Sequence, residues 1–159
     1  MFKYFFALVV FTFFLCAQTI HFSEEKYFES LEMSFNKKGK ISFFKDKIVI
    51  VYANDKTILT YSDNLLIKEK RSDKVELDLR KKPAVKMFFI LFEAIYFDKK
   101  EILQAYFTLK TINGITKLIP HKSIATYIKG VAYQKKGKHL DFLKINMSNN
   151  DRILIEENY

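Results

Sequence analysis

Residues 83–96 have the sequence PAVKMFFILFEAIY, and this stretch decides how the rest of the chain is interpreted. Pro83 interrupts a run of strand-like segments, because proline cannot donate to a central β-ladder. From Ala84 to Tyr96 the apolar residues lie on every side of the predicted helix, with no polar stripe. A helix without a polar face must be covered on most sides. We therefore predict one long helix packed against a larger apolar surface.

The segments on either side of this helix predict that surface to be a β-sheet. Aromatic and β-branched residues are abundant, as strands require, and turn residues recur about every ten positions. Val75, Leu77 and Leu79, for example, alternate with polar neighbours. Before the helix we predict strands at Tyr27–Phe35, Ile41–Phe43, Ile48–Ala53, Lys56–Ser62, Leu65–Lys70 and Lys74–Leu79. After it we predict strands from about Ala105 to Lys110 and at Ile115–Pro120, Thr126–Gln134, His139–Met147 and Arg152–Glu156.

A second, short helical segment is predicted directly after the first. Asp98 and Glu101 have the spacing of an N-terminal capping box, and Phe97 and Ile102 stand at the positions of a hydrophobic staple. This segment should therefore begin at Lys99.

These elements predict a mostly β fold of the α+β class. About ten antiparallel strands form one curved sheet, and the long helix is a lid or plug over its concave face. No linker or internal repeat divides the chain, so residues 18–159 are expected to form one domain. We also expect the protein to be a monomer.

The first residues predict an export signal. Lys3 precedes an apolar run of about a dozen residues, and Ala17 suits signal peptidase cleavage. Residues 1–17 are thus a predicted signal peptide, and cleavage would remove Cys16, the only cysteine. An uncleaved anchor and a lipidated Cys16 remain alternatives. With cleavage, we expect the protein in the periplasm.

Enzyme signatures are missing from the sequence. The three histidines, His21, His121 and His139, are scattered, and no phosphate-binding loop or glycine-framed serine is present. The pair Glu24-Glu25 is expected to be solvated charge rather than an acid–base pair. We predict a non-enzyme with no metal and no cofactor.

The formal charge of +9 favours anionic partners, although lysine-rich strand faces also serve simple solubility. Export makes nucleic acid an unlikely partner, and we predict none. The apolar surplus predicts either a dry core or an apolar cavity for a lipidic ligand.

Several short segments follow one another in a telling order. They are the exported start, Lys38-Gly39-Lys40-Ile41, the stretch from Ala53 to Asp63, the helical block, Leu118-Ile119-Pro120-His121-Lys122 and a final strand after Asp151. Their order resembles that of the outer-membrane lipoprotein carrier family, LolA. The stretch from Ala53 to Asp63 is similar to the family's Asp-Gly-Lys-Thr-Leu and Tyr pattern, and Leu118 to Lys122 to its Leu-x-Pro-Lys segment. By this resemblance the chain is a divergent member.

The resemblance implies an incomplete β-barrel closed by helices that carries the acyl chains of lipoproteins across the periplasm. Its implied partners are acylated lipoproteins, an inner-membrane lipoprotein-releasing ABC transporter, and an outer-membrane acceptor or membrane surface. The family usually has Arg-Pro after its glycine-opened strand, and that arginine holds the lid. Here Lys45-Asp46 stands nearest, and lysine offers a point charge instead of a planar fork.

On this basis we predict which residues line an acyl cavity, each with ordinary dry core as its competing role. They are Leu31, Met33, Phe35, Leu59, Tyr61, Val75, Leu77, Leu79, Phe88, Phe89, Phe92, Phe107 and Leu109. Two other functions stay open: a periplasmic carrier of another lipid, either phospholipid or glycolipid, and a structural docking module with a solid core.

Overall fold

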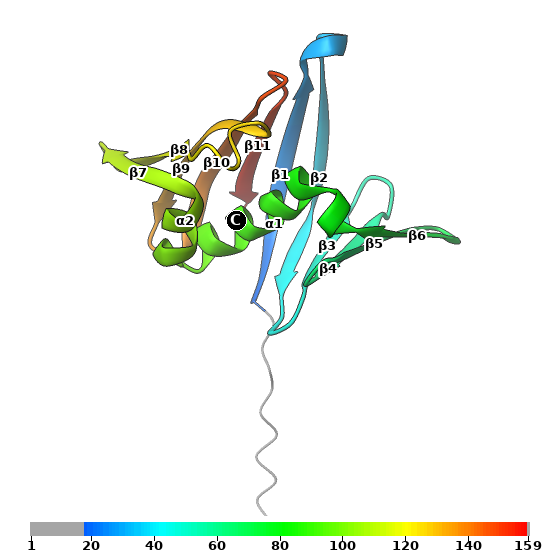
Figure 1. Ribbon diagram of the computed structural model, residues 1–159. Helices are drawn as coiled ribbons and strands as arrows, with labels where there is room; N and C mark the ends of the chain where they lie inside the picture. Colours follow the sequence, from blue (N-terminus) through cyan, green and yellow to red (C-terminus); the bar gives the residue numbers. More distant parts are fainter. Residues whose placement is uncertain (1–17, 159) are drawn as a thin grey trace, which may run out of the picture.

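The computed structural model describes residues 18–158, which form one open antiparallel sheet and two α-helices (Figure 1). The predicted signal peptide, residues 1–17 with Cys16, lies outside the described residues. The strands before the helices are β1 (Gln18–Phe28), β2 (Met33–Phe43), β3 (Ile48–Tyr52), β4 (Ile58–Ser62), β5 (Leu65–Lys70) and β6 (Asp73–Asp78). Then follow α1 (Pro83–Tyr96), α2 (Lys100–Tyr106), β7 (Phe107–Ile112), β8 (Ile115–Pro120), β9 (Ile128–Lys136), β10 (His139–Met147) and β11 (Arg152–Asn158).

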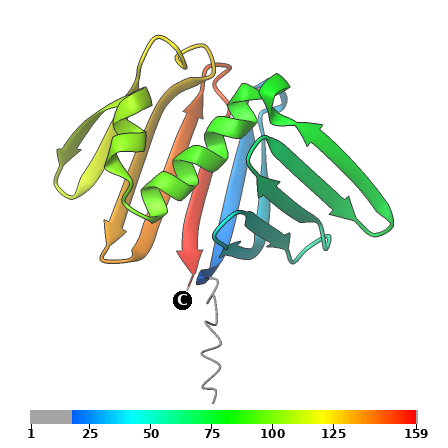
Figure 2. The same cartoon turned by 60° about the horizontal axis from the view of Figure 1, so that its bottom comes forward.

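The sheet has eleven strands in the order β6-β5-β4-β3-β2-β1-β11-β10-β9-β8-β7. The first and last strands, β1 and β11, pair in its centre, while β6 and β7 are its two free edges. The sheet curls without closing, and α1 runs diagonally across its concave face (Figure 2). The predicted fold class, a mostly β open barrel with a helical lid, is confirmed.

The prediction of a single strand at Tyr27–Phe35 is wrong. The chain turns back within it, through a 3₁₀ turn at Glu29–Leu31 and a left-handed Glu32 with φ of 50°. This tip contains no glycine, proline, asparagine or aspartate, and the single Ser30 is a weak signal of a turn. The strand that precedes it, β1, was not predicted at all, and it pairs with β2 along its whole length.

The predicted capping box of α2 is also wrong. Asp98 has a left-handed φ of 55°, and no side chain caps the start of α2 at Lys99. The Asp98 carboxylate lies 2.8 Å from Lys135 Nζ instead. That ammonium group donates to the carbonyl oxygens of Ile95 and Tyr96, at 3.1 and 2.9 Å. Lys135 therefore caps the C-terminal end of α1, where a positive charge is favourable.

Aromatic stacking fixes the second half of α1 on the sheet. The ring of Phe43 on β2 stacks on Tyr96 and Phe92, with ring centroids 4.5 and 5.7 Å apart. One helical turn earlier, Phe89 stacks on Tyr61 of β4 at 4.5 Å. Leu91, Phe92, Ala94, Ile95 and Tyr96 are all buried. This half of the interface is a dry core.

Gly39 on β2 sits where no side chain fits. A Cβ atom there would lie 2.4 Å from the carbonyl oxygen of Val51 on β3 and 3.0 Å from the Phe22 ring. The backbone contact cannot yield without shifting the strand pair. The glycine that opens this strand is therefore required by close approach of two strands.

We predict that Gly39→Ala lowers the free energy of unfolding by about 1–3 kcal/mol, because it overpacks the β2–β3 pair. Urea denaturation followed by circular dichroism measures this change. Gly130→Ala is the matched control, since its Cβ would lie 3.9 Å from the nearest atom. Equal stability of Gly39→Ala and wild type would contradict the predicted clash.

Candidate functional site

A cavity of about 400 Å³ lies between the concave face of the sheet and the first half of α1. The helix contributes Ala84, Val85, Phe88 and Phe89 to its wall. The sheet contributes apolar residues from both of its halves, namely Leu59, Leu66, Ile128, Ile145, Met147 and Ile153. The cavity therefore lies beneath the N-terminal end of α1 and is lined by strands from both halves of the sheet.

The sequence of α1 explains why a cavity forms at this end. Its first turns carry the small side chains of Ala84 and Val85, and Val85 keeps 36% of its surface exposed. The last turns carry Phe92, Ile95 and Tyr96, which fill the space above the sheet. The first turn of α1 thus leaves space above the sheet, and the last turns fill it.

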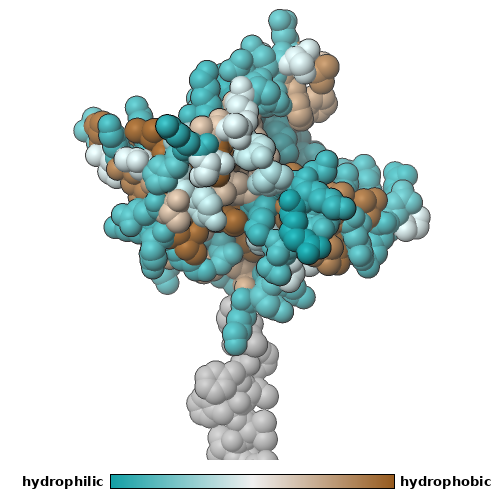
Figure 3. Space-filling view, in the orientation of Figure 1, coloured by the Kyte–Doolittle hydropathy of each residue, from teal (hydrophilic) through white to brown (hydrophobic). Residues whose placement is uncertain are grey.

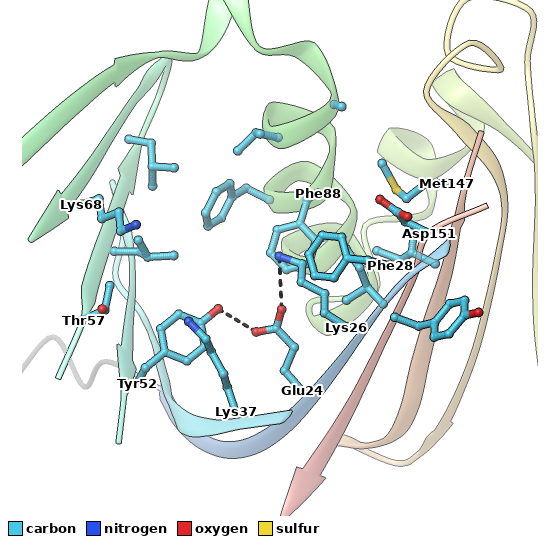
Figure 4. A pocket seen from close by; sticks show the side chains of 18 of the residues that line it. Glu24, Lys26, Phe28, Lys37, Tyr52, Thr57, Lys68, Phe88, Met147 and Asp151 are labelled. Carbon is cyan, nitrogen blue, oxygen red and sulfur yellow. Dashed lines mark hydrogen bonds and ion pairs between the residues drawn. The ribbon is translucent and has the colours of Figure 1, made fainter. Parts of the chain in front are cut away.

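A polar cluster forms one wall of the cavity, although it lies on the inner face of a central strand (Figure 4). Ile20, Phe22, Glu24, Lys26 and Phe28 share one parity of β1, which places them on the same face. Ile20 and Phe22 are buried core. The next two inward positions are charged.

Glu24 is only 5% exposed, and its carboxylate has two partners. Tyr52 on β3 donates its hydroxyl to Glu24 Oε2 at 2.7 Å, and Lys26 Nζ lies 3.5 Å from Oε1. A buried carboxylate needs such partners, because an uncompensated charge away from water is costly. Burial raises the pKa of the Tyr52 hydroxyl above its ordinary value, and the negative charge of Glu24 raises it further.

Two more lysines line the cavity, in different electrostatic settings. Lys37 Nζ lies 4.5 Å from the centre of the Tyr52 ring and 3.7 Å from Asp55. Lys68 shares its β5 parity with the buried Leu66, so it belongs to the concave face. Figure 4 shows its nitrogen turned towards the space in front of the helix.

A second hollow of about 400 Å³ adjoins the first, towards the tip of the β1–β2 hairpin. It shares Glu24, Lys26, Phe28, Lys37 and Tyr52 with the cavity. Its other walls come from Leu31 and Phe35. Figure 3 shows apolar surface close to this tip, which projects beyond the rest of the sheet (Figure 1).

Of the residues predicted to line an acyl cavity, Leu59, Phe88 and Phe89 lie in the wall of the cavity described above. Tyr61, Leu79, Phe92 and Phe107 lie instead in the dry core, and Leu77 and Leu109 pack against it. Leu31, Met33 and Phe35 are exposed at the hairpin tip, because the chain turns there, and Leu31 and Phe35 line the second hollow. Val75 is half exposed on the edge strand β6.

Lys45, the residue nearest to the family's lid arginine, lies in the exposed turn between β2 and β3. It borders a small hollow with Glu93 and Phe97, at the C-terminal end of α1. Within residues 18–158 no hydrogen bond or ion pair joins Lys45 to the helix. It is placed close to the helix end that is already sealed, away from the cavity.

Sequence reasoning missed the polar wall of the cavity. Glu24 was expected to be solvated, and Lys26, Lys37 and Tyr52 were not singled out. The signal that finds Glu24 and Lys26 is the inward parity of Ile20, Phe22 and Phe28 around them. That parity becomes visible only when β1 is recognised as a strand.

Within the described chain, no group of three or more histidine, cysteine, aspartate or glutamate side chains is arranged to hold a metal ion. Neither helix among residues 18–158 has both the length and the apolar character needed to cross a membrane.

Comparison with known proteins gives a distant structural likeness only. No family model and no curated protein matches the sequence. Among solved structures, the Mycobacterium tuberculosis lipoprotein LppX aligns with 90% of this chain and 86% of its own, with 11% sequence identity and a TM-score of 0.40.

The raised pKa of Tyr52 predicts how stability depends on pH. Tyr52 keeps its proton in the folded protein at a pH where the unfolded chain loses it, near 10.0. Its contribution is therefore fully present below pH 10 and decreases as the pH rises beyond it. We expect wild type to lose more unfolding free energy than Tyr52→Phe between about pH 9 and about pH 11. Urea titrations across this range test it, and parallel profiles would contradict it.

Proposed function

We propose that this protein is a lipid carrier that encloses acyl chain in the cavity beneath the first half of α1. The observation that carries the proposal is an apolar cavity of about 400 Å³ under a helix whose other end is firmly packed. Such a cavity is within the range of about 300–1,000 Å³ that is typical of small-molecule sites. Because most of its lining is apolar, the cavity favours an apolar ligand.

The protein would have to enclose the acyl chain without reacting with it. Each methylene group taken from water contributes about 0.8 kcal/mol, so an acyl chain of ordinary length is held by several kcal/mol. Release then depends on an acceptor that binds the same chain better. A volume near the lower end of the typical range suits one acyl chain, and the three chains of a triacylated anchor require α1 to move outwards.

The contacts of α1 support an opening of this kind. Phe92 and Tyr96 hold one end of the helix to Phe43 by ring stacking. At the other end Lys86 donates a hydrogen bond to the Asn64 side chain, and Val85 stays partly exposed. Polar contacts at a surface contribute little, since water replaces them. Met87 and Phe89 are buried, so it is the first turn of α1, Pro83 to Lys86, that can lift at modest cost while the rest of the helix stays in place.

The setting we propose is the LolA-like one. After cleavage of residues 1–17, the protein would move in the periplasm between an inner-membrane lipoprotein-releasing ABC transporter and an outer-membrane acceptor or membrane surface. Its cargo would be acylated lipoproteins. The open sheet with a helical lid supports this role, because a carrier of acyl chains needs a cavity with a movable cover. Phospholipid or glycolipid cargo fits the same cavity and is separated by experiment.

Mass spectrometry of lipids that co-purify with the mature protein identifies the cargo. Enrichment of acylated lipoprotein over a mock purification would support the LolA-like cargo. Recovery of phospholipid or glycolipid alone, even when lipoprotein export is blocked, would contradict the lipoprotein cargo but support a lipid-carrier function. A complete absence of lipid, with no binding of added fatty acid, would favour a docking module and contradict the proposal.

A charged substitution in the cavity wall separates lipid binding from folding. Phe88 lines the cavity and is only partly buried, so Phe88→Glu should leave the fold intact and place a charge against the acyl chain. We expect at least a tenfold loss of affinity for a fluorescent fatty acid, since burying an unpaired charge is costly.

Ile112→Glu is the matched control, because Ile112 is 59% exposed on β7 and lies outside the cavity. Circular dichroism verifies the fold of both variants. Equal affinities of the two folded variants would show that the acyl chain does not occupy this cavity.

A further inference from the structure

We propose that the lipid bound here carries an anionic head group, and that Lys68 binds it. This inference rests on the proposed carrier function and adds to it the chemical class of the ligand. Among the cargoes that fit the cavity it favours phospholipid over the anchor of a lipoprotein, whose diacylglyceryl group carries no charge. It also gives the orientation of the bound lipid in the cavity. The acyl chain lies beneath Phe88, and the head group lies at the β5 side of the cavity, where Lys68 projects.

The first step is the position of Lys68 in the sheet. Its cross-strand neighbours are Leu59 on β4 and Val75 on β6. Neither neighbour offers a carboxylate. Leu66 and Leu59 line the same cavity, so the Lys68 stem runs along apolar wall and its ammonium group stands at the border of that wall. This is the position that an amphiphile needs for its polar end.

The second step is the pairing of the other charges around the cavity. The Glu24 carboxylate forms an ion pair with Lys26, whose Nζ lies 3.5 Å from Oε1. Asp55 faces both Lys37 and Lys70, at 3.7 and 3.3 Å.

Asp151, the second acid in the cavity wall, is held by the β1–β2 hairpin tip and by its own loop. It accepts hydrogen bonds from the backbone N–H of Glu29 and the side chain of Asn149. Within residues 18–158, Lys68 is thus the cavity lysine that no acidic group pairs with.

The third step is the chemistry that this arrangement selects. A carboxylate or phosphate head group would form a charge-assisted hydrogen bond with the Lys68 ammonium group, and such bonds are stronger than neutral ones. A neutral head group of the same size would gain no ion pair. The cavity therefore favours an anionic amphiphile over a neutral one with the same acyl chain.

Isothermal titration calorimetry of the mature protein with dodecanoate and with dodecanol, at neutral pH, tests the inference. The two probes have the same chain length and differ in the charge of the head group. We expect wild type to bind dodecanoate roughly three- to tenfold more tightly than dodecanol. Lys68→Gln should remove this preference by weakening dodecanoate binding alone, and Lys68→Arg should keep most of it.

Lys70→Gln is the matched control, because Lys70 lies on the same strand and pairs with Asp55 outside the cavity lining. It should leave the preference unchanged. Equal affinities of wild type for the two probes, or equal effects of Lys68→Gln and Lys70→Gln, would overturn the head-group inference while dodecanol binding still supports the carrier. Failure of wild type to bind either probe would overturn both.

Discussion

One helix has to cover the concave face of a sheet that is much wider than the helix is long. α1 has 14 residues, which makes it about 21 Å long. Eleven strands at roughly 4.8 Å spacing are about 48 Å across before the sheet curls. Even laid diagonally, as in Figure 2, the helix cannot seal the whole face. The cavity is a consequence of this mismatch.

The side chains of α1 decide where the uncovered space lies. Large aromatic residues in its second half interlock with Phe43, so water and ligand are excluded there. Small residues in its first half leave room above Leu66 and Ile145. Where the apolar lining ends, β1 supplies Glu24 and Lys26. A packed helix end, an apolar space and a charged border on β1 therefore lie next to one another beneath α1.

The sequence predicted the fold class because alternation and turn residues are local signals. The bounds predicted for β5, β8 and β10 agree with the structure, and α1 differs by one residue. The cavity was harder to predict, since its walls come from strands far apart in the chain. Parity within a strand shows which residues share a face, but only the crossing point of α1 decides whether that face is filled. Phe92 and Phe88 are one helical turn apart, and only Phe88 borders the space.

The position of a bound acyl chain is the most direct test of this account. A fatty acid with a photoactivatable diazirine in its chain, irradiated in complex with the mature protein and mapped by mass spectrometry, reports that position. The account predicts labelling of Phe88 and of peptides that carry Leu59 or Ile145, from three elements that meet only at the cavity. Labelling confined to exposed residues outside the cavity, such as Ile112 and Ile119, would contradict it.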